Sequence, residues 1–323
     1  MNVLGIDAGG TKTSLVFINK EDLRNDSFKN YQERTYGPSN YVYVGNKGIK
    51  RLIKGALRDF DITTPQNTYV IAGFAGAGFD ERQSEIRKVF EEMGFDRKKV
   101  YITSDADLLL LSIGNNGIVL IAGTGSICLG RRIRRSDGTL IEYRAGGYGF
   151  RSFSEPGGYQ LGMKAIDAAL KIEDCREQES SILYQRVKDY FKIRNLSKLT
   201  PLLYPTRDDR GEVQEKIAGL AKVVLNTAYE GDKVALTFAK ETLNGLADEI
   251  RAVFRRLGFE ESIVALHGGL FADPRGEKLL MKPLMRHPFL KGLNLKFETL
   301  GIRSGDKNPL IEAVKYWISR EVL

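Results

Sequence analysis

The chain contains the same short device twice, a glycine-rich turn between two runs of residues that favour β-strands. The first turn covers residues 7–13 and reads Asp-Ala-Gly-Gly-Thr-Lys-Thr, and the second covers residues 122–126 and reads Ala-Gly-Thr-Gly-Ser. Apolar and β-branched residues lie on both sides of each turn, as in strands. Because glycine has no Cβ, such a turn can present several backbone N–H groups and a hydroxyl on one concave side, which suits phosphate oxygens. Two of these turns could hold one polyphosphate from both sides, and they indicate a chain that binds a nucleotide.

Neither turn fits the other common phosphate-binding loops. The P-loop and the dinucleotide fingerprint both require a helix directly after the glycines, whereas strand-forming residues follow Thr13. A pair of ordinary tight hairpins would explain either turn taken alone. The repetition of the turn, and the acidic Asp7 at the end of the first strand, favour phosphate binding.

With 323 residues, the chain is long enough for two domains, each with its own hydrophobic core. Its hydrophobic content of 42% and charged content of 28% are typical of a soluble globular protein. No apolar stretch approaches the length of a membrane span, and the chain begins with a strand instead of a signal peptide. We therefore expect a cytoplasmic protein with no membrane partner.

The few cysteines and histidines exclude several kinds of site. Cys128 and Cys175 lack metal-ligand spacing, so we expect no disulfide scaffold, zinc site or iron–sulfur site built within this chain. His267 and His287 are the only histidines, and no nucleophile–histidine–acid grouping can be read from the sequence. The chemistry is therefore expected to rest on carboxylates, hydroxyls and backbone amides.

The net charge raises the question of a nucleic-acid partner. It is 49 − 41 = +8, and the densest basic stretch is Arg131–Arg135, just before a Ser-Asp-Gly turn. This stretch lies in a predicted hairpin with no interleaved aromatic residues and no recognised nucleic-acid module. We therefore expect a solvated hairpin tip and no nucleic-acid partner, with the positive charge helping to attract an anionic nucleotide.

The order of predicted elements indicates an α/β layer fold. Strands at 69–76 and 100–103 alternate with helical patterns in the first third of the chain, and a second block opens at Ile118 and becomes mostly helical over residues 156–257. A late strand covers residues 262–266. From the repeated device we place a boundary near residue 105, which gives one domain of residues 1–105 plus 307–323. The second domain is residues 106–306, with a helical insertion.

Two aspartates follow predicted strands. At the end of the first strand, Asp7 could hold a magnesium ion against bound phosphates, although a turn-forming aspartate that caps its own backbone is the simpler alternative. Asp105 ends a later strand and could orient a substrate hydroxyl and accept its proton during phosphoryl transfer. Asp107 competes for that role, but it belongs to the start of the following helix if the strand ends at Thr103. We rank Asp105 first.

Polar and glycine-rich segments elsewhere offer groups for a small substrate. Asn40, in a Gly-Pro-Ser-Asn-Tyr loop, has a donor and an acceptor that match a pair of sugar hydroxyls, and an Asx-type turn is an equal alternative. The segment at Gly147 and Tyr148 places an aromatic ring where a substrate could stack. Gly268 and Gly269 could let the backbone approach a flat base closely. An ordinary turn would explain each glycine segment taken alone.

Taken as an ordered set, these motifs resemble the N-acetylglucosamine kinase family of the actin/hexokinase/Hsp70 superfamily, including its archaeal broad-specificity hexokinases. The resemblance runs from Gly5 to about Trp317, and the activator ATPases of acyl-CoA reductases and dehydratases are related. The loop at 37–41 and the helix start at 229–232 look especially like the archaeal hexokinases. The matching segments are residues 7–13, 104–106, 122–126, 146–149 and 268–270.

The resemblance implies two ribonuclease-H-like domains that close over ATP, Mg²⁺ and a sugar bound in an interdomain cleft, and it makes a homodimer plausible. Asp7 would serve the magnesium ion and Asp105 would be the general base. The phosphates would lie against Gly9, Gly10, Thr11, Lys12, Thr13, Gly123, Thr124, Gly125 and Ser126, and the adenosine against Gly268 and Gly269. The sugar would lie against Asn40, Gly76, Asp105, Gly147, Tyr148 and Glu155.

The chain departs from the family's pattern at one point. Where the family has an acidic pair followed by Gly-Ser, this chain has Ser154, Glu155 and Pro156, and Tyr148 replaces the usual tryptophan. Serine is a weaker partner than a carboxylate for sugar hydroxyls, which puts the identity of the substrate in doubt more than phosphoryl transfer. We therefore predict an ATP- and magnesium-dependent kinase for a hexose or an (N-acetyl)amino sugar. The alternatives are a nucleotide-dependent activator ATPase and a degenerate kinase kept as a sugar sensor.

Overall fold

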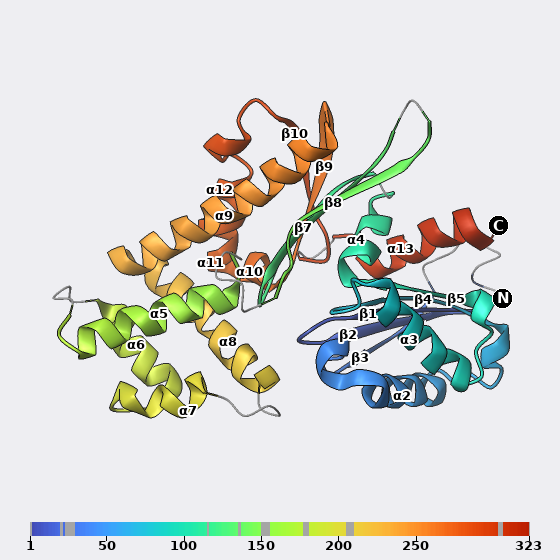
Figure 1. Ribbon diagram of the computed structural model, residues 1–323, viewed down its shortest axis with the longest axis horizontal. Helices are drawn as coiled ribbons and strands as arrows, with labels where there is room; N and C mark the ends of the chain where they lie inside the picture. The colour runs from blue at the N-terminus through green and yellow to red at the C-terminus, as the bar shows by residue number, and fades with distance from the viewer. Residues whose placement is uncertain are drawn as a thin grey trace. The chain divides into compact units, whose positions relative to one another are not determined.

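The computed structural model describes residues 2–19, 22, 30–114, 116–134, 137–149, 156–176, 181–204, 210–302 and 306–322. The chain divides into two compact units (Figure 1), unit 1 formed by Met1–Asn116 and Lys307–Leu323, and unit 2 by Gly117–Asp306. The domain limits predicted from the repeat differ from this division in the placement of residues 106–116. No helix in the described part of the chain is both long and apolar enough to span a membrane.

Unit 1 is built on a five-stranded mixed sheet with the strand order β3-β2-β1-β4-β5. The first three strands are antiparallel neighbours, and β1 is parallel to β4, as β4 is to β5. The strands are β1 (Asn2–Ala8), β2 (Thr13–Ile18), β3 (Gln32–Tyr36), β4 (Thr68–Phe74) and β5 (Val100–Ser104). The helices are α2 (Tyr41–Asp59), α3 (Asp80–Glu92), α4 (Asp105–Ser112) and α13 (Pro309–Trp317), with short turns η1 (Pro65–Asn67), η2 (Arg97–Lys99) and η6 (Ile318–Val322).

Helices cover both faces of this sheet, as Figure 1 shows for α2 and α3 on one side and α4 and α13 on the other. The side chains of β1 alternate between the faces: Leu4 and Ile6 pack toward α2 and α3, whereas Val3 packs toward α4 and α13. On the second face α13 approaches closely at Gly5, where a Cβ would lie 2.9 Å from Val314. By the same alternation, Asp7 lies on the face of α4.

Unit 2 repeats the same sheet, in the order β10-β9-β6-β7-β8 with the same parallel and antiparallel pairs. The strands are β6 (Gly117–Ala122), β7 (Ser126–Ile133), β8 (Leu140–Gly146), β9 (Glu261–His267) and β10 (Asn294–Thr299). This repeated order confirms the predicted α/β fold of two ribonuclease-H-like sheets. It arises because each glycine turn joins the first two strands of its own sheet.

The rest of unit 2 is helical, as predicted for residues 156–257. The long helices are α5 (Gly158–Glu173), α6 (Ile182–Phe191), α8 (Arg210–Tyr229) and α9 (Lys233–Leu257). The shorter ones are α7 (Thr200–Leu203), α10 (Gly269–Ala272), α11 (Pro274–Gly276), α12 (Lys282–Leu284), η3 (Leu196–Leu199), η4 (Glu277–Met281) and η5 (Pro288–Leu290). The helix α9 lies along β7, where Gly130 allows close packing because a Cβ there would lie 2.4 Å from Val253.

Candidate active site

Asp7 is the last residue but one of β1, at the point where this strand meets the first glycine turn. Its neighbour across the sheet on β4 is Gly73, and the carboxylate is half-buried. Burial raises the pKa of Asp7 to about 6, against the opposing charge of Lys12. A carboxylate with reduced hydration gains from a cation close by, which is what a magnesium ion would supply.

Asp105 is the first residue of α4, directly after β5. Ser104 caps this helix: its hydroxyl oxygen accepts from the N–H of Asp107 at 3.1 Å and its hydroxyl donates to the Asp107 carboxylate at 2.6 Å. The carboxylate of Asp105 accepts from the N–H of Ala106 at 3.0 Å. Because the Asp107 carboxylate accepts this hydrogen bond, it takes part in the cap of α4, as expected for a residue at the start of that helix.

The charge of Asp7 acts on the carboxylate of Asp105. Burial and, after it, the negative charge of Asp7 raise the pKa of Asp105 to about 6. The two residues belong to β1 and the end of β5, with β4 between them, and Gly73 on β4 has no Cβ to keep α4 away: a Cβ there would lie 2.7 Å from Leu108. Two carboxylates with pKa values near neutrality suit the paired roles of metal ligand and proton acceptor.

The first glycine turn is closed by a backbone hydrogen bond from the N–H of Gly9 to the carbonyl of Lys12, at 3.0 Å. Gly10, Thr11 and Lys12 are exposed, and none of their backbone N–H groups donates within the described part of the chain. The hydroxyl of Thr13, predicted to face a phosphate, is buried and donates to the carbonyl of Gly37 at 2.8 Å. The exposed amides are therefore what this turn offers to a ligand.

The loop that carries Asn40 is fastened to the same turn. The N–H of Ser39 donates to the carbonyl of Gly9 at 3.1 Å. The side-chain oxygen of Asn40 caps α2 by accepting from the N–H of Val42 at 3.0 Å, which is the Asx-type alternative considered above. Its amide NH₂ group is not needed for this cap and can still donate to a sugar hydroxyl.

Gly76 lies against Asn40. Its φ of 82° favours glycine, and a Cβ there would lie 2.7 Å from the Asn40 side-chain oxygen. The guanidinium of Arg82, on α3, donates to the carbonyl of Gly76 at 2.6 Å. Arg82 could not be singled out from the sequence, because a single arginine in a highly charged helix carries no pattern.

Unit 1 thus brings together Asp7, Asp105, the first turn, Asn40 and Gly76. No group of three or more histidine, cysteine or acidic side chains that could hold a metal ion occurs among the described residues. Because Mg²⁺ commonly keeps several waters and takes one or two carboxylates along with substrate phosphates, Asp7 still fits this ion.

The second glycine turn is closed by a shorter-range backbone bond, from the N–H of Gly123 to the carbonyl of Gly125, two residues on, at 2.9 Å. It is held by the first residues of α5, where Gly158 and Tyr159 donate their N–H groups to the carbonyls of Gly123 and Thr124, both at 2.8 Å. The positive end of the α5 dipole therefore lies at this turn, which favours an anionic ligand.

Two further glycine segments lie against the second turn. Gly268 has a φ of 114°, and a Cβ there would lie 2.3 Å from the carbonyl oxygen of Ala122. A Cβ on the next residue, Gly269, would meet no atom within 4 Å, so this segment leaves open space. Gly147 donates its N–H to the carbonyl of Ser126 at 2.9 Å. Unit 2 thus gathers the residues predicted for phosphates and adenosine, together with Gly147.

The remaining residues predicted for the site in unit 2 lie in different surroundings. The ring of Tyr148 is 71% exposed, and the Arg144 guanidinium lies 4.8 Å from its centroid. The hydroxyl of Ser126 donates to the carboxylate of Glu249, on α9, at 2.9 Å. No local pattern in the sequence marks Glu249. Glu155 lies outside the described residues.

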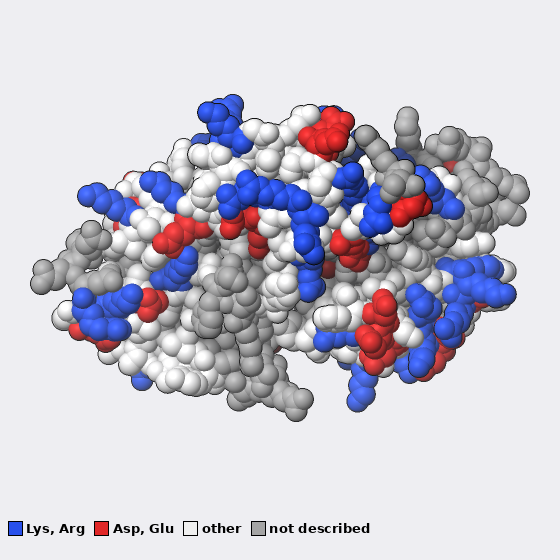
Figure 2. Space-filling view, turned by 45° about the horizontal axis from the view of Figure 1, so that its top comes forward, with Lys and Arg blue, Asp and Glu red and all other residues white. Residues whose placement is uncertain are grey.

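The basic stretch is engaged within its own unit. Arg131 pairs with Glu142 at 2.6 Å, Arg132 donates to the carbonyl of Leu257 at 2.8 Å, and Arg134 pairs with Asp137 at 2.9 Å; Arg135 lies outside the described residues. On the face drawn in Figure 2, acidic side chains are interspersed among the basic ones. These three guanidinium groups therefore hold the hairpin and the end of α9.

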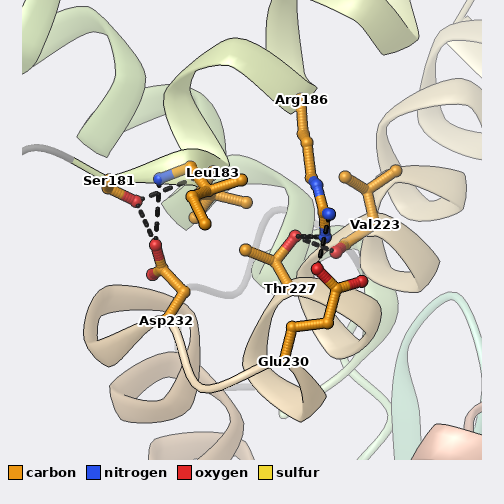
Figure 3. Close-up of polar contacts among 8 residues, drawn as sticks. Ser181, Leu183, Arg186, Val223, Thr227, Glu230 and Asp232 are labelled. Carbon is orange, nitrogen blue, oxygen red and sulfur yellow. Dashed lines mark hydrogen bonds and ion pairs between the residues drawn. The ribbon is translucent and has the colours of Figure 1, made fainter.

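The segment 229–232, singled out by its likeness to archaeal hexokinases, joins helices (Figure 3). Asp232 caps α9 by accepting from the N–H of Ala235 at 3.0 Å, and its second oxygen accepts from Ser181, the cap of α6, at 2.9 Å. The Arg186 guanidinium donates to Thr227 at 3.0 Å and to Glu230 at 2.6 Å. These contacts fasten α6 to α8 and α9, so the segment has a structural role in unit 2.

Comparisons with known proteins agree with this arrangement. The chain is 31% identical over 270 residues to the N-acetylmuramic acid/N-acetylglucosamine kinase of Clostridium acetobutylicum, covering 82% of this chain and 83% of that protein. It is 26% identical over 303 residues to the N-acetyl-D-glucosamine kinase of Dictyostelium discoideum, covering 88% and 90%. A crystal structure from Chromobacterium violaceum, provisionally named an N-acetylglucosamine kinase, superposes with a TM-score of 0.70 at 21% identity and 98% coverage of both chains.

The family model of the BadF/BadG/BcrA/BcrD ATPases matches residues 4–286. This range includes both glycine turns, both aspartates and the segment at Gly268. The predicted relation to N-acetylglucosamine kinases and to activator ATPases is thereby confirmed. The chain belongs to the BadF/BadG/BcrA/BcrD ATPase family.

Proposed function

We propose that this protein is an ATP- and magnesium-dependent sugar kinase that transfers the γ-phosphoryl group to a hydroxyl of a hexose or an (N-acetyl)amino sugar. The observation that carries the proposal is the placement of two carboxylates beside a turn with exposed amides: Asp7 lies at the end of β1, and Asp105 directly follows β5. The names of the Clostridium and Dictyostelium relatives support an N-acetylated sugar as the acceptor.

In this proposal each group has a task that its surroundings suit. Asp105 accepts the proton of the sugar hydroxyl, and a pKa of about 6 places it near the pH at which a general base works well. Asp7 serves the magnesium ion, which when bound would neutralise phosphate charge. Asn40 and Gly76 face the sugar, and Gly147, Tyr148 and Glu155 are proposed for the same substrate.

The nucleotide is assigned to backbone groups. The amides of the turns Gly9–Thr13 and Gly123–Ser126 bind phosphate oxygens, helped in unit 2 by the N-terminus of α5. Gly268 and Gly269 border the adenosine, and the proposal is supported by the absence of any atom within 4 Å of a Cβ placed on Gly269. A cytoplasmic location belongs to the same proposal, and so does a homodimer, which is supported by the family resemblance alone.

The membership of the ATPase family keeps one alternative open, a nucleotide-dependent activator that holds an iron–sulfur cluster between two subunits. Such a cluster needs cysteine ligands, and Cys128 is buried on β7 whereas Cys175 is exposed after α5. At most one accessible cysteine per chain could then serve. Absorbance of the anaerobically purified protein in the visible range would reveal a cluster.

The decisive experiment is a coupled ADP-release assay with Mg-ATP and a panel containing N-acetylmuramic acid, N-acetylglucosamine, glucosamine and glucose, with Asp105→Asn as the control. The proposal predicts turnover on at least one sugar and its loss in the control. ATP binding without turnover on any sugar would contradict the kinase and favour a sensor.

A further inference from the structure

The feature that the proposed function does not use is Glu249, a half-buried carboxylate in the middle of α9. The neighbouring positions toward the sheet are apolar: Val253 and Leu257, one and two turns further along, pack against Gly130 of β7. A glutamate therefore occupies a place in the strand-facing stripe of this helix where a leucine would bury more apolar surface. Its carboxylate must have a partner that makes up for the loss of hydration.

That partner is the glycine turn at the beginning of β7. Ser126, Cys128 and Gly130 alternate on the face of β7 that meets α9. The hydroxyl of Ser126 donates to Oε1 of Glu249 at 2.9 Å. Burial and the charge of Glu249 together raise the pKa of the Cys128 thiol, as expected for a carboxylate close to it. A hydrogen bond to an ionised acceptor is stronger than one between neutral groups.

The same carboxylate fixes a second glycine segment. Gly146 has a φ of 72°, and a Cβ there would lie 2.4 Å from Oε1 of Glu249, so only glycine leaves room for the carboxylate. The next residue, Gly147, donates its N–H to the carbonyl of Ser126. Glu249, Ser126 and Gly146–Gly147 thus form one contiguous group beneath the second turn.

We propose that Glu249 is a positioning residue for ATP: by holding Ser126 it keeps the amides of the turn at Gly123–Gly125 in the arrangement that binds phosphate. The proposal rests on the function proposed above. The role of Ser126 then differs from the predicted one. Its hydroxyl donates a hydrogen bond to Glu249, and the residue contributes to nucleotide binding by fixing the backbone of the turn. Thr13 has the corresponding position in unit 1, where its hydroxyl donates to a carbonyl instead.

The test compares Glu249→Ala, Glu249→Gln, Ser126→Ala and the double variant Ser126→Ala/Glu249→Ala, with Asp248→Asn as a matched control on the exposed side of α9. Mg-ATP affinity is measured by calorimetry, the kinetic constants in the ADP-release assay, and Tm by scanning calorimetry. We expect Glu249→Ala and Ser126→Ala each to weaken ATP binding about tenfold, with kcat at saturating ATP within about threefold of the wild type.

The double variant should bind ATP no more weakly than the weaker single variant, because both changes break one interaction. Glu249→Gln should recover most of the affinity, since its amide oxygen still accepts from Ser126. A lowered Tm with unchanged ATP affinity in Glu249→Ala, or losses that multiply in the double variant, would overturn the proposal. If Glu249→Ala does not fold, Glu249→Gln and Ser126→Ala decide.

These outcomes separate the two proposals. A wild-type protein that binds ATP but phosphorylates no sugar would contradict the kinase, while the affinities of the variants would still decide on Glu249. A wild-type protein that binds no ATP would overturn both.

Discussion

The two units share one sheet topology but carry different chemistry at the same place. In unit 1 the residue before the last of the central strand is Asp7, opposite Ser14 on β2; in unit 2 it is Ile121, opposite Ile127 on β7. Each of the turns that follow is closed by a backbone bond from its first glycine, to the residue three positions on in unit 1 and two positions on in unit 2. The comparison indicates that the turn is the common device and that the carboxylate is the addition specific to unit 1.

Later strands of both sheets also lead into residues proposed for the site, although these strands do not correspond in the topology. In unit 1 the edge strand β5 leads into Asp105 at the start of α4, where the charge of Asp7 acts on the carboxylate. In unit 2 the strand β9, which corresponds to β4 of unit 1, leads into Gly268 and Gly269, which offer backbone and open space. This difference supports the proposal that unit 1 supplies the proton acceptor and the metal ligand, and that unit 2 contributes backbone groups to the nucleotide site.

The largest effect is expected when unit 1 loses the carboxylate that unit 2 lacks. Asp7→Asn keeps the size of the side chain but removes the charge that a magnesium ion would use, so turnover in the sugar-kinase assay should fall by a factor of about 100 or more. The apparent affinity for Mg²⁺, measured by titrating the metal at fixed ATP, should fall as well. Unchanged metal dependence would show that Asp7 only caps its own turn.

A smaller effect, on stability alone, is expected in the helical part of unit 2. Asp232→Ala removes the cap of α9 and the bonds to Ser181 and Ile182 at 2.9 and 3.0 Å, which should cost about 2 kcal/mol of unfolding free energy. Urea unfolding measures this loss, with Asp189→Ala on the exposed side of α6 as the control. The KM for ATP should stay within about twofold of the wild type; a larger change would give this segment a part in nucleotide binding.

The smallest effect concerns the dependence of stability on pH in unit 1. Asp105 has a pKa of about 6 in the folded protein against an ordinary value of 3.8, so between these values the folded state holds a proton that the unfolded state has lost. The contribution of this group to the unfolding free energy therefore falls as pH rises from about 4 to about 6.

Without Mg²⁺ and nucleotide, Asp105→Asn should accordingly be more stable than the wild type at pH 8, by less than the limit of about 3 kcal/mol that pKa values of 6 and 3.8 set. The difference should vanish at pH 4, where the wild-type carboxyl is protonated in the folded state. Thermal unfolding at both pH values measures it, with Asp248→Asn as the control. Equal stabilities of Asp105→Asn and the wild type at pH 8 would mean that folding does not raise the pKa of Asp105.

Much of this comparison could be predicted from the sequence. The repeated strand–turn–strand device indicated both sheets, because a glycine turn between apolar runs is a local signal. Asp7 and Asp105 could be predicted at the ends of strands for the same reason, because the apolar run before each of them is also a local signal. The loop around Asn40 is local too, and it made an Asx-type cap an equal alternative to sugar binding. The structure shows this cap.

The parts that could not be predicted depend on contacts between distant residues. Ser126 and Glu249 are 123 positions apart, and Thr13 and Gly37 are 24 apart, so no spacing rule connects them. The sequence therefore suggested that both hydroxyls face phosphate, whereas the structure directs each of them to a neighbouring segment. That Thr13 and Ser126 contact a nucleotide through their backbone groups stays a prediction.

The central claim is that unit 1 carries the chemistry and the turn of unit 2 holds the nucleotide, and calorimetric titration of Mg-ATP into two variants tests it most directly. A Cβ at Gly123 would meet no atom within 4 Å, so Gly123→Val is compatible with the fold and fills the space in front of the turn. The account predicts that Asp105→Asn binds ATP within about threefold of the wild type but turns over no sugar, and that Gly123→Val weakens binding at least about tenfold. Full ATP affinity in Gly123→Val, or turnover by Asp105→Asn, would contradict it.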